Sequence, residues 1–393
     1  MPFYRALLTL VLLASVANAD DVLRTLDNKT VSGNLVGVND KEVLIKTNDG
    51  VVKTPLDNVI ALDLRPVKGL APGTAYNEIR LVDDTALLCG KYAIKGKSVE
   101  ATLLSGQPVV IPMASVASIL RGADDAKLRK AFLALLNEKV KRDRIVIYKG
   151  GDVNDLPGTI GEADAEGNKI KFLSEAGDIE VPIANLQGLI FFRPDGAGPV
   201  NPVCMVYDTA GNAIAAVKVV VDGKKATIVT TIPKVNIECD TAVIAKFDYN
   251  MGKLSFLSDL IPTKVVEKSG VGLIVAYRKD LNLDGDPIAL EGRPYPKGLS
   301  LHAHTELEYD LKGKFKKFSA VLGVDPRVGS ESQPKVTIEV DGKTVFSEII
   351  TTKNVRPIEV DVTKASSMRI IVSSQNFLDL HDHVTIANPK VTQ

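Results

Sequence analysis

The chain has no tryptophan and only four histidines among its 393 residues. Every histidine lies beyond residue 300, at His302, His304, His381 and His383. A catalytic triad would therefore need the last quarter of the chain to supply its histidine base. Cysteine is almost as scarce, with Cys89, Cys204 and Cys239 too few and too widely spaced for a disulfide scaffold or a zinc site. A Cys204–Cys239 bridge and buried free thiols remain as the alternatives.

The chain also lacks an excess of charge, because 48 basic residues balance 48 acidic ones. This balance gives no electrostatic reason to expect nucleic acid or anionic lipid as a partner. No glycine-rich phosphate loop follows a strand-like run. Two carboxylates for glycoside hydrolysis are never excluded by sequence alone, but no segment has the pattern of a large cleft-forming domain that would hold a sugar chain between them. The sequence therefore predicts a protein that is not an enzyme.

No apolar run after the first 19 residues is long enough to span a membrane. The first 19 residues themselves have the three parts of a secretory signal. Arg5 supplies a positive charge, residues 6–16 are apolar, and Ala17-Asn18-Ala19 precedes Asp20. A bilayer span takes about 20 apolar residues, so this run is too short to be one. We expect an exported protein, periplasmic or extracellular, that begins at Asp20 and has no transmembrane segment after cleavage.

Most of the chain consists of short runs rich in valine, isoleucine, leucine and threonine, separated by glycine, aspartate and asparagine. This texture is typical of β-strands joined by tight turns. One pattern recurs in the segments 50–62, 106–119 and 177–189. In each of them a turn glycine is followed by a proline, then by an apolar residue and a second apolar run. An upstream glycine accompanies each copy, at Gly33, Gly90 and Gly161. Each unit predicts four or five strands with a one-turn 3₁₀ segment after the proline, as in small SH3-like or Sm-like barrels.

One segment has helical spacing instead, because Leu128, Phe132, Leu135, Leu136 and Val140 form an apolar stripe. Acidic residues at its start and basic residues at its end suit the helix dipole. We interpret this helix as structural, connecting two repeats. The expected organisation is a signal peptide at 1–19, barrel repeats at 20–65 and 75–121, a helix at 123–142, a third repeat at 143–193, a degenerate fourth at 203–252, and a β-sandwich at 254–393.

The C-terminal third has strongly alternating strands and an Asp341-Gly342 hairpin turn between two of them. Its segments 295–305, 307–311 and 318–325, with the closing segment 382–389 and the lead-in 253–262, resemble the NPCBM family of carbohydrate-binding modules. The resemblance implies a galactose-binding-like jelly-roll sandwich of the kind attached to glycoside hydrolases or other exported bacterial domains. The chain departs from the family at Thr385 and Ile386, where an acidic residue and a tryptophan are usual.

The predicted function is therefore non-catalytic binding of glycans or glycosylated envelope material. The alternative is a structural or protein-interaction protein of the cell envelope whose sandwich no longer binds sugar. Loops at the ends of a sandwich usually carry binding. The polar and aromatic residues expected there are Tyr295, Lys297, His302, His304, Arg327, Asp379, His381, Asp382 and His383.

Two metal hypotheses stay open beside this one. Histidines two apart on a strand share a face, so His302 and His304 could meet His381 and His383 in a histidine-rich site. The alternative is that His302 and His383 hydrogen-bond internally and pin the closing segment. The segment from Asp280 also resembles a calcium loop, although no flanking helices are evident and Pro287 occupies its eighth position. Its candidate ligands are Asp280, Asn282, Asp284, Asp286 and Glu291. Apart from calcium at this loop, no cofactor is expected.

Overall fold

The computed structural model describes residues 20–27, 29–138, 141–149, 152–193, 201–269, 272, 274–324, 328, 332–351, 355–375 and 382–393. The chain divides into two compact units after Tyr249. The protein is mainly β, with several sheets and one α-helix among these residues, which confirms the predicted fold class. The three cysteines are free thiols, so the Cys204–Cys239 bridge is not formed. Burial raises the pKa of the Cys89 thiol to about 12, which keeps it protonated and unreactive.

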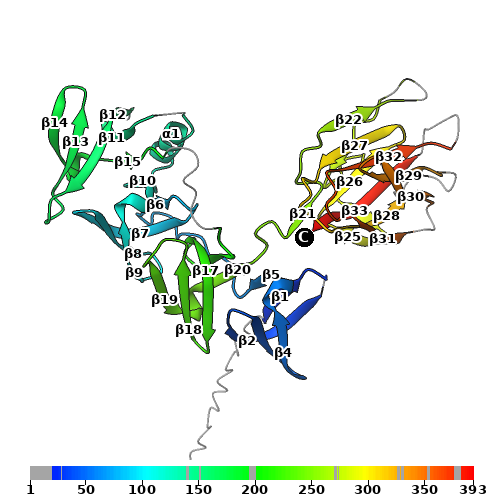
Figure 1. The fold of residues 1–393 in the computed structure, drawn as a ribbon, viewed down its shortest axis with the longest axis horizontal. Coiled ribbons are helices and arrows are strands. Elements are labelled where there is room, and N and C mark those ends of the chain that lie inside the picture. Colours follow the sequence, from blue (N-terminus) through cyan, green and yellow to red (C-terminus); the bar gives the residue numbers. More distant parts are fainter. Residues whose placement is uncertain are drawn as a thin grey trace, which may run out of the picture. The chain divides into compact units, whose positions relative to one another are not determined.

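The first unit contains four copies of one supersecondary pattern, five strands with a 3₁₀ turn before the last strand (Figure 1). The first copy comprises β1 (Asp21–Thr25), β2 (Thr30–Val38), β3 (Glu42–Thr47), β4 (Gly50–Pro55), η1 (Leu56–Asn58) and β5 (Val59–Asp63). The second comprises β6 (Asn77–Leu81), β7 (Ala86–Lys95), β8 (Ser98–Leu103), β9 (Pro108–Pro112), η2 (Met113–Ser115) and β10 (Val116–Leu120).

The third and fourth copies follow the helix. The third comprises β11 (Asp143–Lys149), β12 (Asp152–Ala163), β13 (Lys169–Ser174), β14 (Gly177–Pro182), η3 (Ile183–Asn185) and β15 (Gly188–Ile190). The fourth comprises β16 (Cys204–Asp208), β17 (Ala213–Asp222), β18 (Lys225–Thr230), β19 (Asn236–Asp240), η4 (Thr241–Val243) and β20 (Ile244–Asp248). Asp240 replaces the proline before η4 and caps the turn by accepting a hydrogen bond from the Ala242 amide at 2.7 Å. This replacement explains why the fourth copy looks degenerate in sequence.

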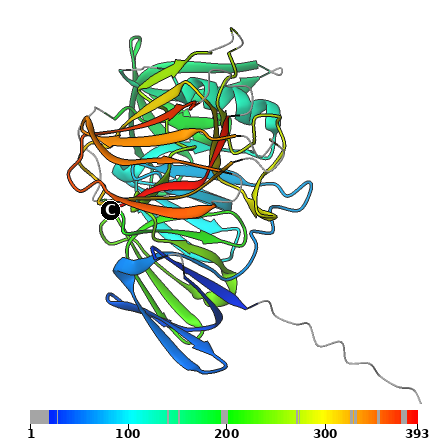
Figure 2. The ribbon, with the colours of Figure 1, turned by 90° about the vertical axis from the view of Figure 1, so that its right-hand side faces the viewer.

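Each copy folds back on itself because its second strand is bent. The second strand pairs with the first strand and the third, and it carries a register shift in every copy. Such a bulge bends the strand and increases its twist. The first strand then lies between the second and the last. The strands of the first copy are drawn in blue in Figure 2. Whether each copy is a domain in its own right remains a prediction, since the four together form one compact unit.

The copies associate in nested pairs through their last strands. The closing strand β5 pairs antiparallel with β20, and β10 pairs antiparallel with β15. An arginine after a closing strand reaches the 3₁₀ carbonyls of the paired copy in three cases. Arg65 donates to the Thr241 carbonyl at 2.8 Å, and Arg121 donates to the Ala184 carbonyl at 2.9 Å. Arg193 completes the set by donating to the Ala114 carbonyl at 3.1 Å. Copy one is therefore joined to copy four, and copy two to copy three.

The helix α1 (Ala126–Leu136) is shorter than the predicted span of 123–142. The Asp125 side chain caps its start by accepting from the Lys127 and Leu128 amides, as aspartate does at helix N-termini. The helix ends at Leu136, with Asn137 as the C-cap, and β11 already begins at Asp143. Its stripe residues Leu128 and Phe132 are buried, whereas Val140 lies outside the described residues. The Arg129 guanidinium holds the helix to copy two through an ion pair of 2.9 Å with the buried Glu78 carboxylate.

The second unit is a sandwich of two antiparallel sheets. One sheet has the order β23-β26-β33-β28-β31, with β21 added to β33, and the other has the order β22-β27-β32-β29-β30. Their strands are β21 (Leu254–Phe256), β22 (Lys264–Glu267), β23 (Arg278–Lys279), β26 (Gly298–His302), β27 (Thr305–Asp310), β28 (Lys317–Val324), β29 (Lys335–Val340), β30 (Lys343–Ile349), β31 (Arg356–Asp361), β32 (Ser367–Ser373) and β33 (His383–Thr392). A separate hairpin consists of β24 (Ile288–Leu290) and β25 (Arg293–Tyr295). Buried Leu, Ile, Val and Phe side chains of both sheets form one core, together with Tyr309, which is 1% exposed.

A fragment of residues 250–393 is expected to fold alone, because its sheets and core are complete within the second unit. We expect a single cooperative transition in thermal unfolding followed by circular dichroism. The fragment 264–393, which lacks β21, is the matched comparison and should melt at a lower temperature. A gradual loss of signal from the 250–393 fragment would contradict the prediction.

Candidate functional site

The candidate binding surface is the end of the sandwich where β26 and β28 end and β29 and β33 begin. Here His302 and His383 are directly paired across neighbouring strands. Their rings meet edge to face, with centroids 5.4 Å apart. The Ala303 amide donates to the Asp382 carbonyl at 2.9 Å, which joins the turn after β26 to the start of β33. The structure therefore brings together His302, His304, Asp382 and His383 of the predicted set.

Two of these four side chains are buried. His302 is 5% exposed, and its Nδ1 lies 3.2 Å from the Ala303 carbonyl oxygen. Asp382 is 3% exposed, and its Oδ1 accepts from the Gln333 amide at 3.0 Å. The Asp382 Oδ2 is also buried and has no hydrogen-bond partner among the residues that the structure describes. These contacts tie the closing strand to the turn before β29 at this end of the sandwich.

His304 and His383 are only half buried. The expectation that His302 and His304 share a strand face is wrong, because β26 ends at His302. His304 adopts a left-handed conformation with φ of 65° in the turn to β27. Its amide donates to the Val372 carbonyl at 2.7 Å, which anchors the turn to β32. Arg327, Asp379 and His381 lie outside the described residues.

Tyr295 and Lys297 lie elsewhere, at the opposite end of β26. Lys297 precedes His302 by five positions, which is about 16 Å along a strand. Tyr295 is 7% exposed and packs in the small core of the β24–β25 hairpin with Ile288 and Leu290. The Arg293 guanidinium lies over its ring at 5.5 Å from the centroid. The structure therefore does not bring the predicted aromatic face to the histidines.

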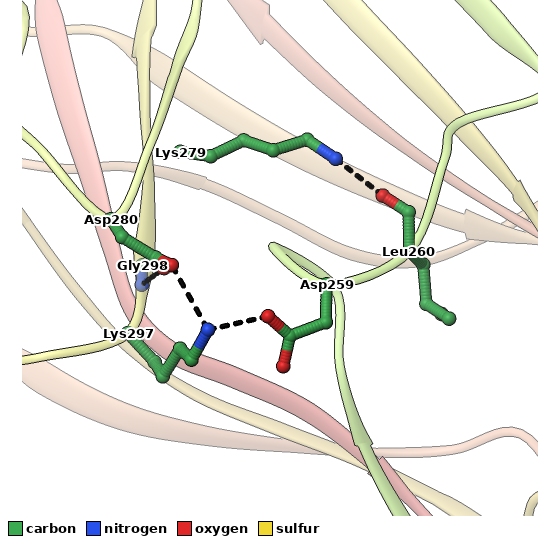
Figure 3. A network of polar contacts seen from close by, with 6 residues as sticks. All are labelled: Asp259, Leu260, Lys279, Asp280, Lys297 and Gly298. Atoms are coloured by element: carbon green, nitrogen blue, oxygen red, sulfur yellow. Dashed lines mark hydrogen bonds and ion pairs between the residues drawn. The ribbon is translucent and has the colours of Figure 1, made fainter. Parts of the chain in front are cut away.

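Lys297 belongs to a separate polar network, shown in Figure 3. Its ammonium group lies between the carboxylates of Asp259 and Asp280, at 3.0 Å from the Asp280 Oδ2. The Asp280 Oδ1 accepts from the Gly298 amide at 3.0 Å, and the Lys279 ammonium donates to the Leu260 carbonyl at 2.5 Å. Both lysines thus hold the lead-in segment to the sandwich. The sequence did not predict these contacts, because Asp259 and Leu260 precede their lysine partners by 19 residues or more.

The charges in this network stabilise one another. Hydrogen bonds to Asp259 and Asp280 raise the pKa of the Lys297 ammonium. Partial burial would raise the pKa of the Asp280 carboxyl, but hydrogen bonds, including that from the Gly298 amide, and the Lys297 charge outweigh it and lower that pKa. Both groups therefore stay ionised over the whole neutral range. The network is a charged clamp on the lead-in segment.

The predicted calcium loop is built around these same contacts. Asp280 pairs with Lys297, and the Asn282 Oδ1 accepts from the amides of Asp284, Gly285 and Asp286 at 2.9 to 3.0 Å. Asp284 and Asp286 are exposed, and Glu291 lies in the turn between β24 and β25 with φ of 49°. Among the described residues, no cluster of three or more histidine, cysteine, aspartate or glutamate side chains could hold a metal ion. Calcium binding and the histidine-rich metal site remain untested predictions.

Comparison with known proteins identifies the second unit. The family model of the NPCBM/NEW2 domain matches residues 253–392, which confirms the family resemblance for the C-terminal third of the chain. A Renibacterium salmoninarum protein named "Putative endo-alpha-N-acetylgalactosaminidase" is 26% identical over 105 residues, which are 27% of this chain and 6% of that protein. The chain thus spans only a small part of that relative.

Two solved structures are also similar. One is CBM51 from Clostridium perfringens GH95 in complex with methyl-galactose, at 24% identity and a TM-score of 0.32, covering 35% of this chain and 99% of that one. The other contains the tandem CBM51 modules of Sp3GH98, a family 98 glycoside hydrolase from Streptococcus pneumoniae, at 13% identity and a TM-score of 0.31, covering 94% and 87%. Scores at this level establish neither a shared ligand nor a shared site. Within the described residues, no helix is both long enough and apolar enough to cross a membrane.

Proposed function

We propose that the protein is an exported, non-catalytic binder of glycans or glycosylated envelope material. The observation that carries this proposal is the match of the NPCBM/NEW2 domain to residues 253–392, almost the whole second unit. The similarity to the named glycosidase covers only 6% of that protein, so it supports a shared accessory module and not a shared reaction. Export is supported by the signal-like residues 1–19, which lie outside the described residues.

The ligand site that we favour is the histidine end of the sandwich. His304 and His383 are half buried, so both residues are partly accessible to a ligand, and imidazole is a group that can hydrogen-bond sugar hydroxyls. The buried His302 and Asp382 would act as positioning residues, since they fix the turn after β26 and the start of β33. The sequence adds three further residues to the proposed site, Arg327, Asp379 and His381. Tyr295 and Lys297 are not part of it, because they lie at the other end of β26.

Replacing His304 by asparagine is expected to weaken glycan binding about tenfold or more, as loss of a good hydrogen bond to a ligand does. Asparagine tolerates the left-handed backbone of His304, so the melting temperature should stay nearly unchanged. A glycan array first identifies the ligand, and calorimetric titration then measures its affinity.

The matched control is Lys312→Asn, which also replaces a left-handed residue but lies beyond the opposite end of β27. The control should bind the glycan as tightly as the natural protein. Equal affinities for His304→Asn and Lys312→Asn would rule out the histidine end as the site.

A second function is favoured by the burial of His302 and Asp382. If these residues only pin the closing segment, the sandwich can serve as a structural or protein-interaction module of the cell envelope. Thr385 and Ile386, which replace the acidic residue and tryptophan of the family, are consistent with such a loss of sugar binding. A silent glycan array, together with retention of one defined envelope protein by residues 250–393, would favour this second function.

A further inference from the structure

The first unit has a free sheet edge in copy one and another in copy three. The copies contact one another in the order one, four, two, three, because β5 pairs with β20, β17 with β7, and β10 with β15. Copies one and three therefore end the row. Within the described part of the chain, β4 of copy one pairs only with β3, and β14 of copy three pairs only with β13. An edge of this kind can accept a further strand.

The hydrogen bonds of copy one show which backbone groups of β4 face outward. The Leu56 amide donates to the carbonyl of Lys41 at 2.8 Å, and these two residues are directly opposite each other in the β3–β4 register. Hydrogen-bonded and non-hydrogen-bonded pairs alternate along an antiparallel ladder. The amides and carbonyls of Val51 and Lys53 therefore point away from β3.

Copy three has the same arrangement at its own edge. The Ile183 amide donates to the carbonyl of Asn168 at 2.8 Å, one position beyond the last pair of the β13–β14 register. By the same alternation, the amides and carbonyls of Asp178 and Glu180 point away from β13. The two edges are therefore in phase for an antiparallel pairing of Val51 with Glu180 and of Lys53 with Asp178.

This alignment also joins two apolar rows that are incomplete in the single molecule. Val52 lies opposite the buried Ile45, and Ile179 lies opposite the buried Phe172. Val52 is nevertheless 36% exposed and Ile179 is 44% exposed, since each belongs to an edge strand. The proposed alignment places Val52 opposite Ile179, so one apolar row would cross both sheets on the same face.

The charges of the two edge strands are opposite in sign. Lys53 is the only charged residue of β4, whereas β14 carries Asp178 and Glu180. Lys53 has a long contact of 3.8 Å with Glu42, and Glu180 is paired with Lys169 at 3.1 Å. Asp178 is exposed and forms no ion pair with any described residue. The alignment places Lys53 directly opposite Asp178, which is a favourable cross-strand pair.

Pairing of two identical edges is less favourable. Two β14 strands in the same phase would place Asp178 opposite Glu180 twice, and like charges in this position are destabilising. Two β4 strands would place Lys53 opposite Val51 and gain no opposite charge. The edges of one molecule do not meet each other, because copies four and two lie between them. Charge complementarity therefore favours β14 of a second copy of this chain as the partner of β4.

We propose that the protein self-associates head to tail, with β4 of one molecule adding to β14 of the next as an antiparallel strand. Both pairs, Val51 with Glu180 and Lys53 with Asp178, exchange backbone hydrogen bonds across the contact. Because the two surfaces differ, the contact is heterologous and can repeat from molecule to molecule. It lies wholly in the first unit, so this proposal and glycan binding by the second unit can fail independently.

Sedimentation velocity on the chain from Asp20 to Gln393 tests the proposal. The weight-average sedimentation coefficient of the natural sequence should rise with protein concentration. Lys53→Glu and Asp178→Lys each place like charges opposite each other, and each should weaken self-association about tenfold. An equimolar mixture of the two variants should associate again, because each variant then meets a partner of opposite charge.

The matched control is Lys91→Glu, which makes the same change of charge at an exposed position of β7 in copy two. It should associate as the natural protein does, and all three variants should keep nearly the natural melting temperature, as surface changes usually do. A natural chain that stays monomeric at millimolar concentration would overturn the proposal. Association that survives Asp178→Lys would assign the contact to two β4 edges or to another surface, and a mixture that stays monomeric would exclude the β4–β14 pairing.

Discussion

Replacing Asn212 by alanine is expected to lower the free energy of unfolding of the first unit by about 2–4 kcal/mol. Asn212 is 0% exposed and lies where copy four contacts copy two. Its Oδ1 accepts from the Leu88 amide at 2.6 Å, and its Nδ2 donates to the Asp208 Oδ2 at 2.6 Å. The variant leaves the buried Asp208 carboxylate and the half-buried Leu88 amide without these hydrogen bonds, at a cost of about 1–3 kcal/mol for each buried group.

The polar contact around Asn212 joins the two nested pairs. The Ala215 amide of copy four donates to the Thr85 hydroxyl at 2.9 Å, and the Thr231 hydroxyl donates to the Asp83 carboxylate. The backbone adds little here, since β17 and β7 share the single pair Ala213↔Ala86. Side-chain hydrogen bonds therefore carry much of this interface, which is why loss of one buried amide should be felt by the whole unit.

Differential scanning calorimetry measures the effect, and the 250–393 fragment identifies the transition of the second unit. For a unit of this size, the expected loss corresponds to a fall of about 5–15 °C in the melting temperature. The control Asn236→Ala changes an exposed asparagine at the start of β19 and should stay within about 0.5 kcal/mol of the natural protein. Equal melting temperatures for the two variants would show that the network does not stabilise the unit.

Local pattern predicted the fold class and the position of the turns. The prolines Pro55, Pro112 and Pro182 each precede a 3₁₀ turn, as expected. The turn follows from residues adjacent in sequence, because proline fixes its own φ and cannot donate to the sheet. The nested pairing of the copies was not predictable in this way. The strands β5 and β20 are about 180 residues apart, and nothing in either sequence names the other as its partner.

The candidate site was also predictable only where local pattern decides the position of a residue. The structure pairs His302 with His383 across neighbouring strands at one end of the sandwich, and that this end binds a ligand stays a prediction. Tyr295 and Lys297 precede the start of β26, so they lie at the end of that strand opposite to His302. Recognising this requires the bounds of β26 and its direction in the sheet. The burial of Asp382 depends on Ser332 and Gln333, which lie about 50 residues away in sequence and have no recognisable pattern.

The repeat glycines show how register corrects a sequence alignment. Alignment placed Gly33, Gly90 and Gly161 together. In the structure, the first residue of copy one, Asp21, pairs with Gly33, and the corresponding Asp143 of copy three pairs with Gly158. Each aspartate also accepts from the amide two residues beyond its glycine, Leu35 at 2.7 Å and Ile160 at 2.8 Å. Gly158, and not Gly161, is therefore the counterpart of Gly33, and Gly90 does not share its role.

Gly33→Ala is accordingly expected to destabilise the first unit by about 1–3 kcal/mol, whereas Gly90→Ala should be neutral or stabilise it by up to about 1 kcal/mol. A Cβ at position 33 would lie 2.4 Å from the Lys46 carbonyl oxygen, a backbone atom that cannot move without breaking the β2–β3 ladder. At position 90 the nearest atom would be the Leu104 Cδ2 at 3.8 Å, and the variant gains from the smaller entropy of its unfolded chain. Neither glycine has a positive φ, so space alone distinguishes them. Urea unfolding of both variants measures the difference, and a shift of the same sign for both would show that close packing at Gly33 is not what the fold requires.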